Sequence, residues 1–307
     1  MVYNVLIVGA GQIASGFDFS DSEDILTHAH AYTKHNGFNL VGFYDVAFEK
    51  AKLAAQKWDC DCFENISNVK SKIDVISICT PDNYHVTSIR QIVELLPKLI
   101  FLEKPIPNNA SEIAYLMDIA KSVPIAVNYS RRYVKEFQEL SRRIFFKEFG
   151  EFVTGVGHYG KGFMHNGSHM IDLLRLLIGN IGSVKTVTKI KDFYPNDPSK
   201  NVDVFFENNA RFSMHVIDCN NYTIFELDLF FEKARIRILD SGFKIEIYKI
   251  VENKVFNGYR KLQKNMDYST QLNSAMFSAM DNIFNFLVRK EKLLCNICDG
   301  YEAIRYA

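Results

Sequence analysis

The residues best suited to chemistry near the N-terminus form the segment GAGQIA, residues 9–14. Gly9 permits a tight turn, Gly11 lets the backbone approach a pyrophosphate because it has no Cβ, and Ala14 lets a helix pack closely on a strand. N–H groups at the start of that helix would face the phosphates. The alternative is a turn that is packed tightly for its own sake. The pattern predicts a dinucleotide site whose cofactor-binding residues are Gly9, Gly11, Gln12 and Ile13.

A carboxylate, Asp45, follows the apolar segment Phe38–Tyr44. An acidic residue at the end of the second strand can accept hydrogen bonds from both hydroxyls of the adenosine ribose. It would repel a 2′-phosphate, and Val46 and Ala47 provide no arginine to receive one. Asp45 therefore favours NAD over NADP.

Two further polar segments follow apolar strands. Thr80 and Pro81 come after Ile73–Cys79, and Glu103-Lys104-Pro105 comes after Leu99–Leu102. The carboxyl edge of such a sheet is where ligands bind. A charged pair at this place is either a salt-bridged strand end or a lysine and a glutamate that face the cofactor.

Several histidines and cysteines have the residue types of metal ligands. His28, His30 and His35 do not share one helix face, because residues two positions apart point in different directions. A solvated or core-edge role is expected for them. Cys295 and Cys298 lack a second pair or a nearby histidine, so we predict no metal site.

These residues need a scaffold. Apolar runs predict strands at Val2–Val8, Phe38–Tyr44, Ile73–Cys79, Leu99–Leu102 and Pro124–Val127, with helices between them at Thr27–Lys34, Ala47–Trp58, Val86–Leu96 and Ser111–Lys121, the last capped by Ser111. This βαβ series predicts an α/β Rossmann domain with a doubly wound parallel sheet over residues 1–128.

The pattern changes after residue 128. Alternating segments predict antiparallel strands at Glu151–His158, Val184–Lys191, Val202–Glu207, Ala210–Ile217, Tyr222–Phe231, Ala234–Asp240 and Phe243–Ile250. Helices are predicted at Val134–Phe145, Ser168–Gly179, Gln271–Leu287 and Tyr301–Ala307. Residues 129–307 are thus expected to form an α+β domain with an open, mostly antiparallel sheet, the last helix being able to pack back on the first domain.

Composition and charge indicate which classes of protein this chain does not resemble. The chain has 307 residues, 48% hydrophobic and 23% charged, with 36 basic and 36 acidic side chains. A balanced charge does not indicate a nucleic-acid partner. No apolar run reaches the roughly 18 residues of a membrane span. Without an export signal, we expect a cytoplasmic protein whose cysteines are reduced.

Several motifs together resemble the Gfo/Idh/MocA oxidoreductase family. They are GAGQIA, Asp45, TPDNYH, FLEKPI, NYSRRY and GSHMIDLLRLLIG, and they extend over nearly the whole chain. The resemblance implies an N-terminal Rossmann domain that binds a nicotinamide cofactor. It also implies a C-terminal domain whose sheet forms homodimers or homotetramers.

By position, the resemblance makes Lys104 the active-site lysine and His169 the general acid/base. Asp172 matches an aspartate that is structural or lines the substrate site. The implied cofactor-side residues are Thr80, Pro81, His85, Glu103 and Asn128. The candidate substrate contacts are Lys104, Tyr129, Arg131, Asn166 and His169.

Two positions depart from the family pattern. Many members have an aspartate four residues before the histidine, where this chain has His165. Either His165 joins the proton transfer as a catalytic group, or the chemistry differs, or His165 and Asn166 cap a helix. The acidic segment Ser15–Asp24 is an insertion that would cover cofactor or substrate.

The expected function is hydride transfer at a secondary alcohol or ketone of a sugar or sugar derivative, including a sugar nucleotide or acidic sugar. Lys104 would stabilise charge on oxygen, and His169 would exchange the proton. Two alternatives stay open: a sugar lyase, epimerase or glycosidase that uses NAD transiently, and a nucleotide-binding scaffold without catalysis.

Overall fold

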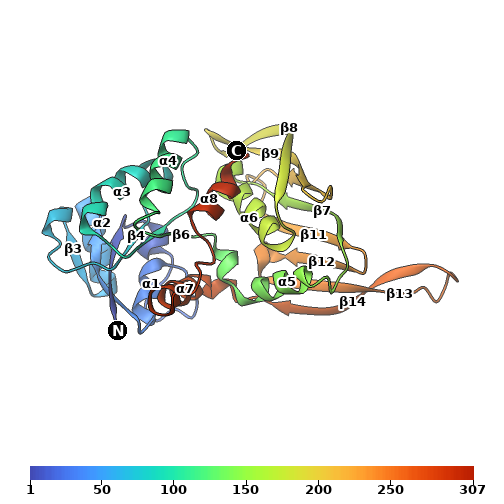
Figure 1. The fold of residues 1–307 in the computed structure, drawn as a ribbon, viewed down its shortest axis with the longest axis horizontal. Helices are drawn as coiled ribbons and strands as arrows, with labels where there is room; N and C mark the ends of the chain where they lie inside the picture. Colours follow the sequence, from blue (N-terminus) through green and yellow to red (C-terminus); the bar gives the residue numbers. More distant parts are fainter. The chain divides into compact units, whose positions relative to one another are not determined.

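The computed structural model describes all 307 residues, Met1–Ala307. The chain forms two compact units (Figure 1). The first contains residues 1–133 together with 273–305, and the second contains residues 134–272 with 306–307. This division differs from the expected boundary at residue 128, because the C-terminal helices belong to the first unit. Met276, Met280 and Ile283 bury their side chains in its core, so apolar burial fixes that helix there.

The first unit is built on a six-stranded parallel sheet in the order β3-β2-β1-β4-β5-β6. Its strands are β1 (Tyr3–Val8), β2 (Phe38–Tyr44), β3 (Asp61–Phe63), β4 (Val75–Ile78), β5 (Leu99–Leu102) and β6 (Ile125–Val127). The chain winds outward from β1 to one side and then from β4 to the other. The carboxyl ends of β1 and β4 therefore form the switch point where ligands bind in such sheets. The predicted Rossmann fold is confirmed.

The helices of the first unit are α1 (His28–Lys34), α2 (Phe48–Trp58), α3 (His85–Ile92), α4 (Ala110–Ile119), α7 (Ala275–Arg289) and α8 (Ile297–Ile304). Strands β4 and β5 are buried along their whole length, as expected for strands covered on both faces.

Four local expectations in this unit were wrong. The helix after the glycine turn is only a five-residue π-helical turn, Gln12–Gly16. Asn109, not Ser111, caps α4, because its side chain accepts from the Glu112 N–H. Helix α8 begins at Ile297, earlier than expected, behind a capping box of Asn296 and Asp299. The short strand β3 had not been predicted.

The second unit contains an eight-stranded sheet in the order β14-β13-β12-β11-β7-β10-β9-β8. All neighbouring strands are antiparallel except β7 and β10. The strands are β7 (Phe152–Tyr159), β8 (Ile181–Tyr194), β9 (Asp197–Phe206), β10 (Arg211–Val216), β11 (Phe225–Phe231), β12 (Ala234–Leu239), β13 (Lys244–Glu252) and β14 (Arg260–Ser269). The predicted open, mostly antiparallel sheet is confirmed.

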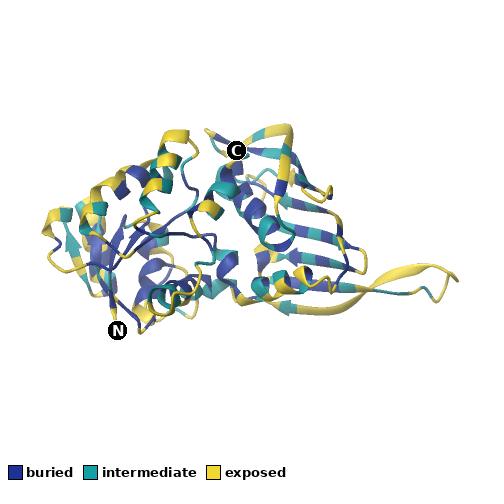
Figure 2. Ribbon diagram, viewed as in Figure 1, coloured by how far each residue is buried: buried dark blue, intermediate teal, exposed yellow.

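Helices α5 (Lys135–Phe145) and α6 (Ser168–Leu177) belong to this unit and contact each other. Along β11 and β12, buried residues alternate with partly exposed ones (Figure 2). One face of the sheet is therefore packed and the other remains open.

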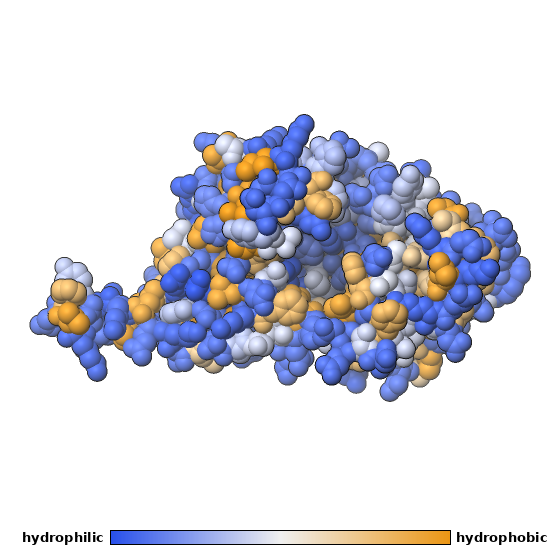
Figure 3. Space-filling view, turned by 180° about the vertical axis from the view of Figure 1, so that it is seen from behind, coloured by the Kyte–Doolittle hydropathy of each residue, from blue (hydrophilic) through white to orange (hydrophobic).

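Strand β14 was not predicted, because its residues are almost all exposed and show no apolar alternation. It pairs with β13 in a long hairpin. Val255, Phe256 and Tyr259 are exposed at its tip, which Figure 3 shows as an apolar cluster on the projection at the left. In neither unit is any helix both long enough and apolar enough to cross a membrane.

Candidate functional site

The glycine turn after β1 is shaped by two glycines for different reasons. Gly9 has φ +92°, and a Cβ there would lie 2.7 Å from backbone atoms of Cys79 and Thr80. Glycine is thus required at position 9 by the conformation of the turn and by the nearby backbone of Cys79 and Thr80, whether or not a ligand binds. A Cβ at Gly11 would meet nothing within 4 Å. The missing side chain at Gly11 leaves open space beside the turn, which fits the close approach of a pyrophosphate.

Asp45, just after β2, is held against the same turn. Its Oδ2 accepts a hydrogen bond from the Ala10 N–H at 2.8 Å, and its Oδ1 accepts from the Ala47 N–H at 2.8 Å. Val46 beside it is exposed and apolar. The structure thus brings the predicted ribose-binding carboxylate to the predicted phosphate-binding turn, and these residues fit a bound NAD.

The other predicted cofactor contacts differ in exposure. Gln12 is exposed beside the turn, whereas Ile13 is half-buried against the core. In the loop after β4, Thr80 is half-buried and Pro81 is exposed. His85 is buried, and its Nε2 lies 3.0 Å from the Thr80 carbonyl oxygen. His85 therefore stabilises the conformation of this loop through its contact with the Thr80 backbone.

Burial has an electrostatic effect on His85. It lowers the pKa of His85, because the charged imidazolium is penalised away from water. A neutral imidazole with its ring against the Thr80 carbonyl is a structural element of the loop. The structure thus places His85 behind Thr80, and its expected contact with the cofactor stays a prediction.

Glu103 and Lys104 follow β5 at the carboxyl edge of the sheet, and the Lys104–Pro105 peptide bond is cis. Glu103 is buried, whereas Lys104 is half-exposed. Oε1 of Glu103 lies 2.8 Å from His28 Nε2 and accepts from Asn128 Nδ2 at 2.6 Å. The cluster joins segments that follow β5 and β6 with the start of α1.

The carboxyl group of Glu103 is ionised in this setting. Burial alone would raise the pKa of Glu103, but hydrogen bonds from His28 and Asn128 and the charge of Lys104 outweigh it, so that the pKa is lowered. Because an ionised carboxylate only accepts hydrogen bonds, Nε2 of His28 is the donor. His28 Nδ1 then accepts from Ser77 Oγ at 3.2 Å, and Ser77 accepts from the Tyr32 hydroxyl at 2.8 Å.

His28 and His30 are fully buried, so the expectation of a solvated or core-edge role was wrong for both. The spacing does place them on different sides of α1. His30 pairs with Asp18 at 2.9 Å, while His28 reaches Glu103, 75 positions along the chain. Sequence spacing gave no signal for the partner of either histidine.

Removing His28 should destabilise the protein strongly. In His28→Ala, the buried Glu103 carboxylate loses the hydrogen bond from the His28 Nε2–H, and we expect the free energy of unfolding in urea to fall by about 3 kcal/mol. The double variant His28→Ala/Glu103→Gln should be more stable than His28→Ala, since no uncompensated carboxylate remains. A double variant that loses the sum of both single effects would contradict this coupling.

The insertion after the glycine turn is anchored by Asp18. This buried carboxylate accepts from the N–H groups of Leu26 at 2.6 Å and Thr27 at 3.1 Å, besides its pair with His30. Phe19 is exposed, with the Lys57 ammonium 4.0 Å from its ring centre. The segment is thus fixed at its base, and its role as a cover stays a prediction.

The segment after β6 holds three more predicted residues. Asn128 is buried and bonded to Glu103. Tyr129 is fully buried and packs in the core of the first unit, and its expected contact with substrate stays a prediction. Arg131 is half-exposed, whereas its neighbour Arg132 is buried and pairs with Asp299 at 3.1 Å.

In the second unit, His165 and Asn166 lie in a π-helical turn, Phe163–Gly167, and His169 lies in the first turn of α6. All three side chains are half-buried. Asn166 Nδ2 donates to the Gly160 carbonyl oxygen at 2.8 Å. No side chain caps α6, so the capping alternative for His165 and Asn166 was wrong. Asp172 is buried in this unit.

The turn that carries His165 is held by the start of β9. Asp197 accepts from the N–H groups of Met164 at 2.9 Å and His165 at 3.0 Å. Asp197 Oδ2 also lies 2.8 Å from His165 Nδ1, and the ring of His165 stacks on Tyr194 with a centroid distance of 3.8 Å. The sequence gave no signal for Asp197, because it lies 32 positions away.

Asp197 should make stability depend on pH in the acid range. Burial alone would raise the pKa of Asp197, but hydrogen bonds from the His165 side chain and the backbone outweigh it and lower the pKa. Its contribution to stability is therefore present above the unfolded value of about 3.9 and is lost as pH falls through the folded value.

The measurement is denaturation of wild type and Asp197→Asn between neutral and acid pH. We expect the wild type to be the more stable protein at neutral pH and the difference to shrink below about pH 4. A difference that stays constant down to pH 3 would contradict the lowered pKa of Asp197.

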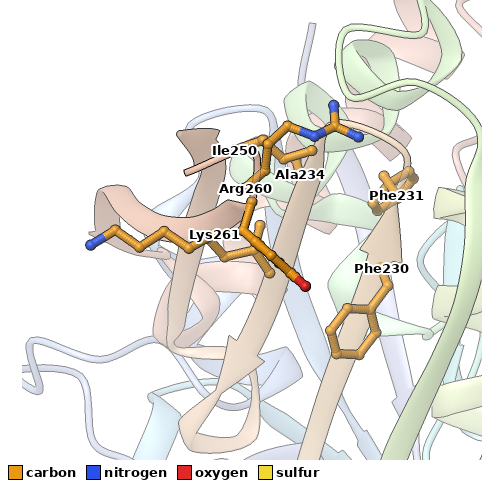
Figure 4. A pocket seen from close by; sticks show the side chains of 9 residues that line it. Phe230, Phe231, Ala234, Ile250, Arg260 and Lys261 are labelled. Atoms are coloured by element: carbon orange, nitrogen blue, oxygen red, sulfur yellow. The ribbon is translucent and has the colours of Figure 1, made fainter. Parts of the chain in front are cut away.

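The hollow in Figure 4 lies at the edge of the second sheet. Its lining comes from β11, β12, β13 and β14 and includes Phe230, Ala234, Ile250 and Arg260. It contains none of the predicted site residues. This hollow is therefore separate from both groups of candidate residues, the one in the first unit and the one in the second.

The comparison with protein families supports the first group. Residues 3–129 match the model of the Gfo/Idh/MocA oxidoreductase family, described as having an NAD-binding Rossmann fold. No curated protein sequence matches the chain significantly.

Solved structures support the fold over the whole chain. UDP-N-acetylglucosamine 3-dehydrogenase from Acidithiobacillus ferrooxidans is similar with a TM-score of 0.76 and 17% identity, covering 99% of this chain and 94% of that one. A putative NADPH-dependent oxidoreductase from Desulfitobacterium hafniense has a TM-score of 0.80 and 15% identity, covering 98% and 92%.

A third similar structure contains ligands. The WlbA dehydrogenase from Bordetella pertussis, in complex with NADH and UDP-GlcNAcA, has a TM-score of 0.77 and 16% identity, covering 99% of this chain and 94% of that one. At these identities the three structures show a shared two-domain fold.

Proposed function

We propose that this chain is an NAD-dependent oxidoreductase that acts on a sugar derivative, which the match of residues 3–129 to the model of the Gfo/Idh/MocA oxidoreductase family supports. The reaction is hydride transfer at a secondary alcohol or ketone. The observation that best supports this proposal is the position of Lys104. Its side chain is half-exposed next to the ionised Glu103, at the edge of the sheet that also holds the glycine turn and Asp45.

Different residues of the first unit bind different parts of the cofactor. The turn at Gly9 and Gly11 receives the pyrophosphate, and the Asp45 carboxylate accepts hydrogen bonds from the ribose hydroxyls. Bound NAD supplies the hydride acceptor or donor. The negative charge of Asp45, without a basic neighbour, disfavours the 2′-phosphate of NADP.

Lys104 provides positive charge and an N–H donor for the reacting oxygen. The buried cluster of Glu103, His28 and Asn128 fixes the backbone from which Lys104 extends. In the second unit, His169 takes part in exchange of the hydroxyl proton, since an imidazole titrates near working pH. Arg131 and Asn166 are proposed substrate contacts.

Sugar nucleotides are the proposed substrate class. Two similar structures support this choice: one is named for UDP-N-acetylglucosamine, and one was crystallised with UDP-GlcNAcA. We further propose a cytoplasmic homodimer or homotetramer, which light scattering after size-exclusion chromatography would test.

The test is to incubate the protein with NAD⁺ and, separately, UDP-N-acetylglucosamine, UDP-GlcNAcA and myo-inositol. Ultraviolet absorbance follows NADH, and mass spectrometry follows loss of two hydrogens from the sugar. We expect both signals with a sugar nucleotide. Cleavage or epimerisation without NADH would favour transient redox, and NAD binding without any change of sugar would favour the scaffold; either would overturn the proposed net oxidation of these substrates.

A further inference from the structure

His165 occupies the position where the family pattern has an aspartate, and the structure places a different aspartate directly behind it. Nδ1 of His165 lies 2.8 Å from Oδ2 of Asp197. The side chain of His165 is 23% exposed, whereas that of Asp197 is 9% exposed. The imidazole is therefore the accessible end of the pair, and the carboxylate is its buried end.

The pair is held in one geometry. Two backbone N–H groups, from Met164 and His165, donate to the carboxylate of Asp197. Tyr194 stacks on the imidazole with an interplanar angle of 17°. A Cβ at Gly162, which has φ +85°, would lie 2.2 Å from Asp197 Oδ2. The backbone thus closes tightly around the carboxylate.

This geometry fixes the tautomer of the histidine. Two backbone N–H groups donate to Asp197, and its pKa is lowered, which matches an ionised, acceptor-only carboxylate. His165 Nδ1 must then carry the hydrogen, and in the neutral ring Nε2 carries the lone pair.

Two neighbouring charged groups, Asp192 and Lys200, make contacts of their own, and the charge of Lys200 also interacts with that of Asp197. The Asp192 carboxylate accepts from Ser199 Oγ at 3.0 Å and from the Lys161 N–H. The ammonium of Lys200 lies 4.8 Å from the Phe163 ring centre. Asp197 is therefore the carboxylate that faces Nδ1 of His165.

We infer that His165 and Asp197 form a proton-accepting dyad that replaces the single aspartate of the family pattern. A neutral imidazole with an ionised carboxylate has the same net charge as one aspartate, and both lose that charge when they gain a proton. The dyad thus undergoes the same change of charge as the aspartate when it gains a proton, but the atom that accepts the proton is Nε2 of His165. Asp197 is a positioning residue, because it acts through His165.

The inference rests on the proposed function for its place in the reaction. As the substrate alcohol is oxidised, its O–H bond would break, His169 would take the released proton first, and the proton would end on Nε2 of His165. Bound NAD⁺ would supply the acceptor for the hydrogen of the C–H bond together with both electrons of that bond, which would leave a carbonyl group. The imidazolium then lies against the Asp197 carboxylate, and the proton returns to water.

The first test needs no substrate. Imidazole ¹⁵N NMR of the full chain, with His165→Gln to assign the signals, reports which ring nitrogen carries hydrogen. We expect His165 to be hydrogenated at Nδ1 in the wild type and to change tautomer in Asp197→Ala. The control is Asp203→Asn, a carboxylate on the same strand that pairs with Arg211 at 2.8 Å, which should leave the signal unchanged. A neutral His165 hydrogenated at Nε2 in the wild type would overturn the dyad, whether or not any variant folds.

The second test uses turnover of UDP-N-acetylglucosamine with NAD⁺. We expect Asp197→Asn to lower kcat about 10- to 100-fold with KM nearly unchanged, and the pH profile of kcat to shift. The double variant His165→Asp/Asp197→Asn should exceed His165→Ala/Asp197→Asn in kcat, since it restores one accepting carboxylate. Equal kcat in the two double variants would overturn the replacement. If the wild type turns over no sugar nucleotide, the proposed function fails, and the NMR result still decides the tautomer that the dyad requires.

Discussion

Replacing Lys104 with alanine is expected to lower kcat by about 10³-fold while NADH binds nearly as in the wild type. The loss removes a positive charge beside the reacting oxygen and a group that takes part in proton transfer, and such groups contribute about 10²- to 10⁴-fold. Lys104 is half-exposed at the carboxyl end of β5, so its removal should leave the fold intact. Rates with UDP-N-acetylglucosamine and NADH fluorescence titration measure the two quantities.

The control lies at the other end of the same strand. Lys98 precedes β5 and pairs with Asp74 at 3.0 Å on the surface, where its side chain is 47% exposed. We expect Lys98→Ala to keep kcat within about twofold and to change stability by less than about 1 kcal/mol. Turnover that survives in Lys104→Ala, or that falls equally in Lys98→Ala, would refute a catalytic role for Lys104.

The two glycines of the turn should respond oppositely to alanine. In Gly9→Ala, the new Cβ would lie 2.7 Å from backbone atoms, and the alanine would have to adopt a φ of +92°. For both reasons the free energy of unfolding should fall by more than about 2 kcal/mol. In Gly11→Ala, the Cβ enters open space, so stability should stay within about 0.5 kcal/mol while the Kd for NADH rises at least about tenfold.

Thermal unfolding and NADH titration of both variants provide the comparison, each variant serving as the control of the other. If the Gly11→Ala protein is fully stable but binds NADH more weakly, then Gly11 is required for binding the cofactor and not for folding. If Gly11→Ala binds NADH normally, the pyrophosphate does not approach this residue and the placement of the cofactor is wrong.

Much of the first domain could be predicted because its signals are local. Leu99–Leu102 and Phe38–Tyr44 are apolar runs that end at turn residues, and the structure gives these strands the same bounds. Gly9 and Asp45 mark a turn and a strand end that together define the nucleotide edge. Such features depend on residues close in sequence, so a single chain shows them.

The partners of the site residues could not be predicted in the same way. His28 finds Glu103 across 75 positions, and Asp197 finds His165 across 32. Each pair forms only when the sheet brings distant segments together, and neither spacing nor periodicity encodes it. The assignment of α7 to the first unit could not be predicted for a similar reason, because its apolar residues do not indicate which hydrophobic core they will join.

Strand β14 shows a third limit. Its outward residues are nearly all exposed, so it carries no apolar alternation, and its pairing with β13 comes from backbone hydrogen bonds. The burial of Tyr129 was also not predicted, because a tyrosine beside predicted site residues gives no local signal that the fold buries it completely.

The most direct test of the account is fluorescence titration of NADH and NADPH into the wild type and Asp45→Ala, with the surface variant Asp118→Ala as control. The account predicts that the wild type binds NADH more tightly than NADPH. In Asp45→Ala, it predicts a rise of about 10- to 100-fold in the Kd for NADH, or about 1.4–2.7 kcal/mol, and a smaller preference between the two nucleotides. Tighter binding of NADPH by the wild type, or no binding of either nucleotide, would contradict it.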